Sequence, residues 1–235
     1  MRLSTIAAAS LILAAPAAQA ATTTVFTDSL LVVVAEGAPD TAFSAANGNL
    51  PDGDRVSIDG NTGDYGPSGF ADALLSFADF ATPAGSAVLS AELEFFTKSF
   101  TNGPVDIYAL AAPFDETTTL NALGPNGFGL FEDGVIAGSP VASATNIADE
   151  SPISFDVTAL VADWAAGAPA YGFGLFNNSG DGWDIQVVTD GDEFSPRLTV
   201  SYETDAVAPI PLPAAGWMLL SGIAGLIGLR RRACA

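Results

Sequence analysis

The sequence predicts an all-β protein, a jelly-roll-like β-sandwich with one short helix, formed by residues 21–205 of a 235-residue chain. Many short apolar runs are separated by Asn-Gly and Asp-Gly dipeptides, which mark tight turns between strands. Residues 89–95 alternate apolar and polar side chains, as a strand with one buried face does. A single stretch, residues 157–164, breaks this pattern with helical spacing instead.

The expected strands follow one another at short intervals. They occupy residues 23–35, 55–58, 73–77, 89–95, 105–110, 171–176, 183–188 and 197–202. In the expected helix, the apolar side chains at positions 157, 160, 161 and 164 share one face, Asp156 or Thr158 can cap the start, and Gly167 can end it. We expect Trp164 to cover the end of a sheet. Residues 36–69 are polar and rich in Gly and Asp, which makes them a candidate functional loop.

The first 20 residues have the three parts of a secretory signal peptide. Arg2 supplies the positive start, an apolar run of about ten residues follows, and Ala18 and Ala20 form a small-x-small cleavage site. The sequence therefore predicts export of the region from residue 21 onward, with cleavage after Ala20.

The last 30 residues, 206–235, have the layout of a membrane-spanning sorting tail. Residues 207–213 are rich in proline, residues 214–229 are uncharged, and a helix over 210–229 covers about 30 Å, enough for one span. The arginines after the span belong on the cytoplasmic side, which places residues 21–205 outside. The signature and cluster residues are Pro211, Leu212, Pro213, Ala214, Arg230, Arg231 and Arg232.

This tail resembles the PEP-CTERM protein-sorting signal, in its Val-Pro-Leu-Pro-Ala variant, with Ile210 in place of the valine. The resemblance implies a Gram-negative-type bacterium and an exosortase-like transpeptidase as partner. It also implies a precursor anchored in the inner membrane that is cleaved near the signature and delivered to the cell surface or extracellular matrix. A permanent single-span anchor is the alternative.

Composition excludes several classes of function. The chain has no histidine and one cysteine, Cys234, which lies in the tail, so a Ser-His-Asp triad and an internal disulfide are both excluded. Residues 21–205 carry 27 acidic side chains against Arg55, Lys98 and Arg197, a net charge of −24. Phosphate backbones would be repelled, so nucleic acid is not an expected partner.

The exported region also resembles the DNRLRE domains, which are extracellular β-sandwich modules related to carbohydrate-binding modules. The matching pattern is Asp156-Val157-Thr158, then Trp164 with Gly167, then Tyr171-Gly172-Phe173, and a final strand over residues 196–202. Residues 114–118 lack the tryptophans that the family has there. The resemblance implies a non-catalytic module that binds extracellular polysaccharide or contributes to the structure of a matrix.

Two sets of residues are candidates for binding. Sugar recognition needs exposed aromatic rings beside polar side chains, and the candidates are Trp183, Asp181, Asp184, Asn177 and Tyr65. Trp183 can instead be a strand aromatic that covers the core. Calcium takes carboxylate and carbonyl oxygens, which acidic Asp-Gly loops supply, and the candidate ligands for a structural Ca²⁺ are Asp190, Asp192, Glu193, Asp52, Asp54 and Asp59. These acids can also be ordinary solvated turn residues.

Three classes of function stay open from sequence alone. The first is a non-enzymatic carbohydrate-binding or exopolysaccharide-associated module, and we expect no catalytic residue in it. The second is a secreted glycosidase or lyase, with a carboxylate pair or with Lys98 and Tyr108 as base and acid. The third is a surface protein with a purely structural role.

Overall fold

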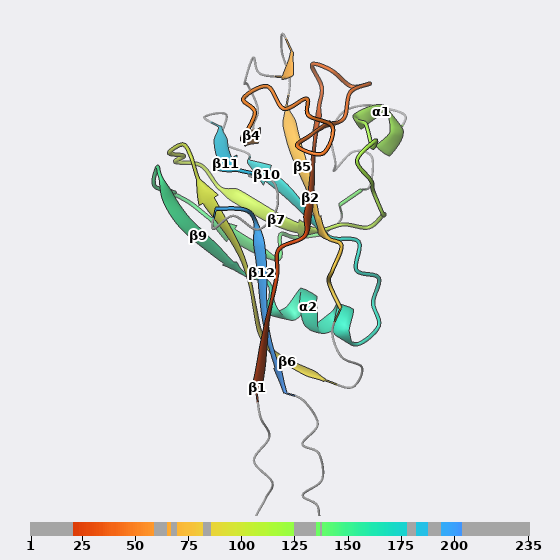
Figure 1. The fold of residues 1–235 in the computed structure, drawn as a ribbon, viewed down its shortest axis with the longest axis vertical. Coiled ribbons are helices and arrows are strands. Elements are labelled where there is room, and N and C mark those ends of the chain that lie inside the picture. Colours follow the sequence, from red (N-terminus) through yellow and green to blue (C-terminus); the bar gives the residue numbers. More distant parts are fainter. Residues whose placement is uncertain are drawn as a thin grey trace, which may run out of the picture. The chain divides into compact units, whose positions relative to one another are not determined.

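The structure is a computed structural model that describes residues 21–58, 65–66, 70–81, 86–124, 135–136, 138–177, 182–187 and 194–203. Residues 21–204 form one compact unit. The described residues form two antiparallel sheets and two short helices, which confirms the predicted all-β class (Figure 1).

Sheet A contains the longest strand of the described part, β6 (Ala87–Thr97), at its centre. The other strands of sheet A are β1 (Ala21–Phe26), β4 (Arg55–Ile58), β9 (Ser151–Asp156), β11 (Trp183–Gln186) and β12 (Arg197–Glu203). Along one side, β6 pairs first with β12 and then with β11, and along its other side it pairs with β9. β1 extends the sheet beyond β12, and β4 extends it beyond β11.

Sheet B runs in the order β3-β2-β5-β10-β7-β8, and every pair in it is antiparallel. Its strands are β2 (Ser29–Ala35), β3 (Phe43–Ser44), β5 (Ala71–Phe77), β7 (Val105–Ala109), β8 (Ala142–Ala144) and β10 (Phe173–Asn177).

The core lies between the two sheets. The alternation predicted for residues 89–95 is confirmed, since Ala91, Leu93 and Phe95 are buried in this core while Glu92 is exposed. Opposite them, Leu75 and Phe173 of sheet B face the same interior. Burial of such side chains contributes about 1.5–3 kcal/mol each to folding.

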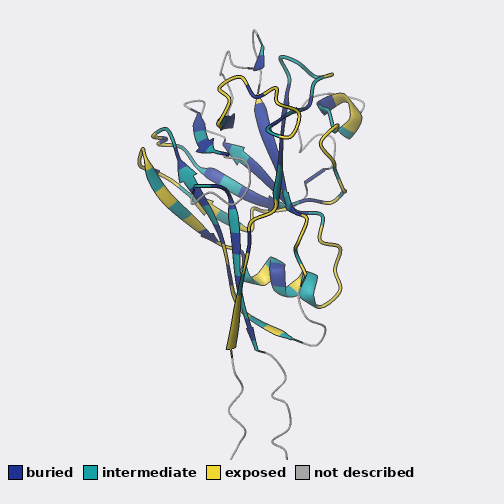
Figure 2. Cartoon of the chain, in the orientation of Figure 1, coloured by how far each residue is buried: buried dark blue, intermediate teal, exposed yellow. Residues whose placement is uncertain are grey.

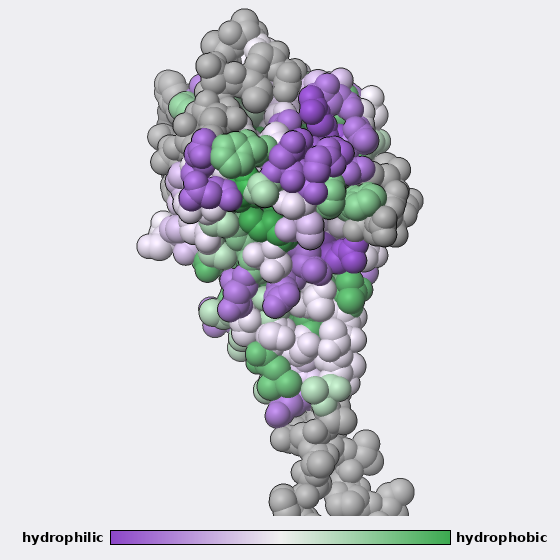
Figure 3. Space-filling model, turned by 90° about the vertical axis from the view of Figure 1, so that its left-hand side faces the viewer, coloured by the Kyte–Doolittle hydropathy of each residue, from purple (hydrophilic) through white to green (hydrophobic). Residues whose placement is uncertain are grey.

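Sheet B is also covered on its outer face. A second cluster of buried apolar residues joins β2, β5 and β7 to the short helix α1 (Leu120–Leu123) and to residues 135–136. Figure 2 shows that burial extends through these strands, whereas exposed residues follow β9 and β1 of sheet A. On the face drawn in Figure 3, hydrophilic clusters are separated by smaller apolar patches.

The predicted helix is α2 (Thr158–Ala165), and the chain turns away at Gly167 with a φ of 106°. Trp164 packs its ring against Phe80 and Phe173, at centroid distances of 5.5 and 5.0 Å, as expected for a residue at the end of a sheet. The Asp156 carboxylate accepts a hydrogen bond from the Thr158 amide at 2.9 Å. The Thr158 hydroxyl accepts one from the Ala91 amide instead of capping the helix.

The predicted elements differ from the structure in several places. The stretch 23–35 is two strands, because the chain leaves sheet A after Phe26 and enters sheet B at Ser29. Strands β3, β8 and β9 and helix α1 were not predicted as elements from local pattern. Among the described residues no helix is long and apolar enough to cross a membrane. The predicted signal peptide (1–20) and the predicted sorting tail (206–235) lie outside those residues.

Candidate functional site

Trp183, the first candidate for sugar binding, is fully buried in β11. Its ring meets those of Phe95 and Phe155 edge-on, at centroid distances of 5.4 and 6.2 Å, and its Nε1 donates to Thr97 Oγ1 at 3.4 Å. No face of the ring is open to solvent, because the strand directs it between the sheets. The structure therefore corrects the expectation that Trp183 stacks on a sugar and gives it the alternative role in the core.

Tyr65, the second aromatic candidate, is buried as well, with 4% of its surface exposed. Its ring packs against Phe43 at 4.9 Å, and its hydroxyl accepts a hydrogen bond from the Ser57 amide at 3.0 Å. The tyrosine thus contacts β3 and β4 and offers no stacking surface, which corrects its predicted role.

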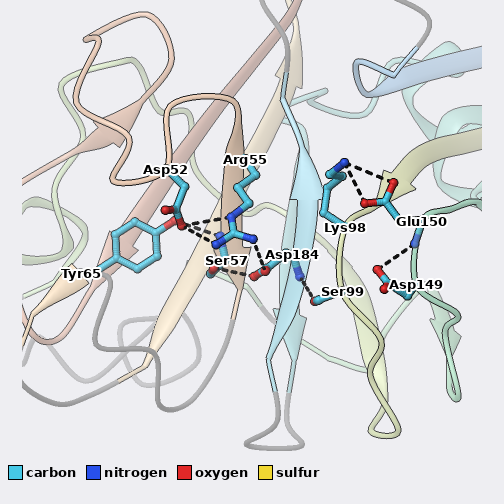
Figure 4. Close-up of polar contacts among 9 residues, drawn as sticks. All are labelled: Asp52, Arg55, Ser57, Tyr65, Lys98, Ser99, Asp149, Glu150 and Asp184. Carbon is cyan, nitrogen blue, oxygen red and sulfur yellow. Dashed lines mark hydrogen bonds and ion pairs between the residues drawn. The ribbon is translucent and has the colours of Figure 1, made fainter.

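The described polar candidates near Trp183 bond to other groups of the protein. Asn177 is buried, and its amide donates to Thr101 Oγ1 at 3.4 Å. Asp184 accepts from Ser57 Oγ at 2.5 Å and pairs with Arg55 at 3.4 Å (Figure 4). Asp181 lies outside the described residues. Asn177 and Asp184 therefore do not form the polar part of a sugar site around Trp183.

Arg55 joins two carboxylates into one charged group (Figure 4). Its guanidinium contacts the Asp52 carboxylate at 2.9 Å on one side and the Asp184 carboxylate on the other. The Ser57 hydroxyl beside them is 3% exposed and already donates to Asp184, so it has no room to attack a substrate. The group joins the loop before β4 to strand β11 and serves the structure.

The same arginine argues against calcium at Asp52. A cation would have to compete with Nε and Nη2 of the guanidinium, which both donate to Asp52 Oδ2. Asp54, the neighbouring candidate, is exposed, and its backbone carbonyl accepts from Val187. In the described part of the chain, no three acidic, histidine or cysteine side chains gather closely enough to hold a metal. Asp59, Asp190, Asp192 and Glu193 lie outside that part.

An aromatic pair that sequence reasoning missed lies on the outer face of sheet A. The rings of Phe96 and Phe194 stand 4.6 Å apart at 58°, and both side chains are half-buried. They line a shallow depression of about 140 Å³ together with Pro152, Glu94 and Arg197. The signal was present in the sequence: in an alternating strand, adjacent Phe95 and Phe96 must point to opposite faces, so one of them faces out.

Charged groups surround this pair. Lys98 Nζ lies 5.8 Å from the Phe96 ring centroid and 3.0 Å from a Glu150 carboxylate oxygen (Figure 4). Glu94 accepts a hydrogen bond from the Thr199 hydroxyl at 3.0 Å. Two of the three basic residues within residues 21–205, Lys98 and Arg197, thus flank the two rings.

The shifted pKa values do not converge on a catalytic site. Burial, followed by the neighbouring Asp106 charge, raises the pKa of Tyr108. Hydrogen bonds from Thr117 and Thr118 lower the pKa of Asp115, and bonds from Thr158 lower that of Asp156. Tyr108 packs in the outer cluster of sheet B, whereas Lys98 follows β6 of sheet A, so the two cannot act together as acid and base.

Comparisons of the chain with protein-family models and with curated proteins find no match.

Proposed function

We propose that the chain is an exported, non-catalytic β-sandwich module that associates with extracellular polysaccharide at the surface or in the matrix of a Gram-negative bacterium. The observation that carries this proposal is the aromatic pair Phe96–Phe194 on the open face of sheet A. Aromatic rings stack on the apolar faces of sugars, and the neighbouring Glu94 and Arg197 supply hydrogen-bonding partners for hydroxyl groups.

The jelly-roll connectivity and the kinship to the DNRLRE domains belong to the same proposal. Two packed antiparallel sheets support it, as does the short helix over residues 158–165 in the place where that family has one. The proposed ligand surface is not the one expected around Trp183. It lies on strand β6 and on the segment that leads into β12.

Export and sorting are the second part of the proposal. Residue 21, the first after the proposed leader cleavage, pairs with Glu203 at the end of β12. Both flanking segments therefore attach at neighbouring points of one sheet edge, and a C-terminal tether would continue directly from β12. A mass measurement on protein purified from the native host tests this part. A mature chain that begins at Ala21 and ends near Ala214 is expected, whereas one that ends beyond Leu229 contradicts cleavage.

Glycan binding is tested on an array with the double variant Phe96→Ala/Phe194→Ala. Loss of both rings is expected to remove about 1–3 kcal/mol of binding free energy, roughly five- to 150-fold in Kd. The matched control is Leu89→Ala, which removes an exposed apolar side chain of the same strand outside the depression. Equal glycan binding by the wild type and the double variant would contradict the proposed site.

A reducing-sugar assay on the same glycans separates binding from catalysis. We expect binding without turnover. Turnover that disappears when one carboxylate is replaced would instead establish the polysaccharide-active enzyme.

A purely structural surface protein is the second candidate. The burial of Trp183 and Tyr65 favours it, because the two aromatic rings that the sequence suggested for sugar stacking both lie inside the fold. A folded protein that binds no glycan on the array would support this candidate.

A further inference from the structure

Most edges of the two sheets carry features that prevent pairing with another chain. In sheet B the outer strands β3 and β8 have only two and three residues. In sheet A, β9 contains Pro152 and ends at Asp156, and β4 begins at Arg55, which is paired with Asp52. Short edges, prolines and charges are the devices that keep sheet edges from joining.

Strand β1 has none of these devices. Its sequence, Ala-Thr-Thr-Thr-Val-Phe, holds no charge and no proline over six residues, in a region with a net charge of −24. It pairs with β12 along its whole length and, among the described residues, with no strand on its other side (Figure 1). Four of its six residues are exposed, including Val25 at 48%.

The backbone of β1 is therefore ready to accept another strand. In an antiparallel ladder, alternate residues direct their amide and carbonyl groups to one neighbour and the rest direct theirs to the other side. On β1 that second set faces away from β12. Threonine and valine also have high strand propensity, so the edge is already in the conformation that a further strand requires.

We propose that the β1 edge pairs in antiparallel fashion with β1 of a second copy of this chain. With a net charge of −24 over residues 21–205, two copies of the chain repel each other, and they can approach most easily where the strands between them are uncharged and β-prone. β1 meets both conditions itself. A two-fold axis normal to the sheet makes it its own complement and joins two six-stranded sheets into one.

The register follows from which side chains face outward. Thr23 and Val25 lie opposite Ser201 and Thr199, on the exposed side of sheet A. Directly opposed residues of an antiparallel pair point to the same face of the sheet. In a two-fold symmetric pair of β1 strands, this holds only if one residue of β1 lies opposite the same residue of the other copy, so that the axis passes between the two. With Thr24 on the axis, Thr23 of each copy lies opposite Val25 of the other, a favourable cross-strand pair. With Thr23 on the axis, Ala21 lies opposite Val25.

Antiparallel pairing also fixes where the two chains continue. Glu203 pairs with Ala21, so residue 204 follows at the same end of β1 at which that strand begins. In the second copy that end points the opposite way. If the tail anchors the protein, which rests on the proposed function, the paired copies project from two facing surfaces and link them.

Cysteine cross-linking tests the pairing on the full-length chain in detergent micelles, in a Cys234→Ser background. Directly opposed residues on antiparallel strands have Cα atoms about 4.5–5.5 Å apart, which a disulfide spans. Thr24→Cys or Thr23→Cys, whichever lies on the axis, is expected to give a disulfide-linked dimer on mild oxidation. Leu89→Cys, at an exposed position on β6, is the control and should not give a disulfide-linked dimer. Equal cross-linking at all three positions, or at none, would overturn the proposal.

A second variant tests the same edge without cross-linking. Thr23→Lys/Val25→Lys puts like charges opposite each other, and sedimentation is expected to show at least a roughly tenfold weaker dimer. Leu89→Lys/Ser154→Lys makes the same charge change elsewhere on sheet A and should dimerise as the wild type does. A dimer that persists in the β1 variant contradicts the proposal, as does a cross-linked partner with a mass other than this chain's. Neither result depends on glycan binding, so this test fails independently of the proposed function.

Discussion

The outer faces of the two sheets differ in how far other parts of the chain cover them. The outer face of sheet B is apolar and closed, with Val32, Val34 and Leu74 packed under α1 and residues 135–136. The outer face of sheet A is open and carries Glu92, Thr199 and the Phe96–Phe194 pair. The side chains of the outer face of sheet A are therefore accessible from solvent, whereas those of the outer face of sheet B contribute to folding.

Substitutions in the core between the two sheets are expected to have the largest effect on stability. Replacement of Trp183 by alanine empties the largest fully buried side chain, and we expect the free energy of unfolding to fall by about 3–5 kcal/mol. Urea denaturation followed by circular dichroism measures it. Trp183→Phe keeps a ring against Phe95 and Phe155 and should cost less. A loss below about 1 kcal/mol would show that the ring is not in the core.

The closed face of sheet B should be nearly as sensitive. Leu74→Ala leaves a cavity between β5 and α1 and is expected to lower the free energy of unfolding by about 2–5 kcal/mol. On sheet A, Leu89→Ala makes the same chemical change at an exposed position and should stay within about 0.5 kcal/mol of the wild type. Similar losses in the two variants would remove the distinction between the faces.

A third test uses the close approach of backbone within sheet B. Gly172 and Gly167 both have positive φ, so an added Cβ strains the backbone at either position. At Gly172 the Cβ would also lie 2.2 Å from the Leu75 carbonyl oxygen, whereas at Gly167 nothing lies within 4 Å. Overpacking of this kind costs about 1–3 kcal/mol. Gly172→Ala is therefore expected to be less stable than Gly167→Ala by that amount in the same denaturation experiment.

The difference between the faces also explains which elements were predictable. Strands β6 and β12 of sheet A alternate where one face meets water, and residues 89–95 and 197–202 were recognised by this signal. In sheet B, residues 31–35 are buried on both faces, so no period showed where one strand ended and another sheet began. The break at Thr27 and Asp28 comes from hydrogen bonds to Ser29 and Ala78, which only the folded chain supplies.

The candidate site was predicted less well than the fold, for a related reason. Composition around Trp183 suited a sugar site, but the direction of one side chain decides its role, and the register with β4 and β6 turns Trp183 inward. Phe96 could have been placed on the outer face from its neighbour Phe95. Its partner Phe194 comes from a distant segment, and only the folded sheet brings the two rings together.

The smallest expected effect concerns the junction between sheet A and α2, where Asp156 ends β9 on the exposed side of the sheet. The pKa of Asp156 is lowered by hydrogen bonds from Thr158, so its carboxylate stabilises the folded state above the ordinary aspartate pKa, about 3.9. That contribution is lost as the pH falls through the lower folded-state pKa. Asp156→Ala should therefore have a slightly lower Tm than the wild type at pH 7, and the difference should vanish near pH 2.

The control for this last measurement is Asp163→Ala, which removes an exposed carboxylate near the other end of α2. A negative charge there opposes the helix dipole, so its loss should leave Tm unchanged or raise it slightly. Both variants remove one charge from the same acidic surface, and the general relief of repulsion at low pH cancels between them. A Tm difference for Asp156→Ala that persists unchanged at acid pH would mean that the side chain acts through packing and not through its carboxylate.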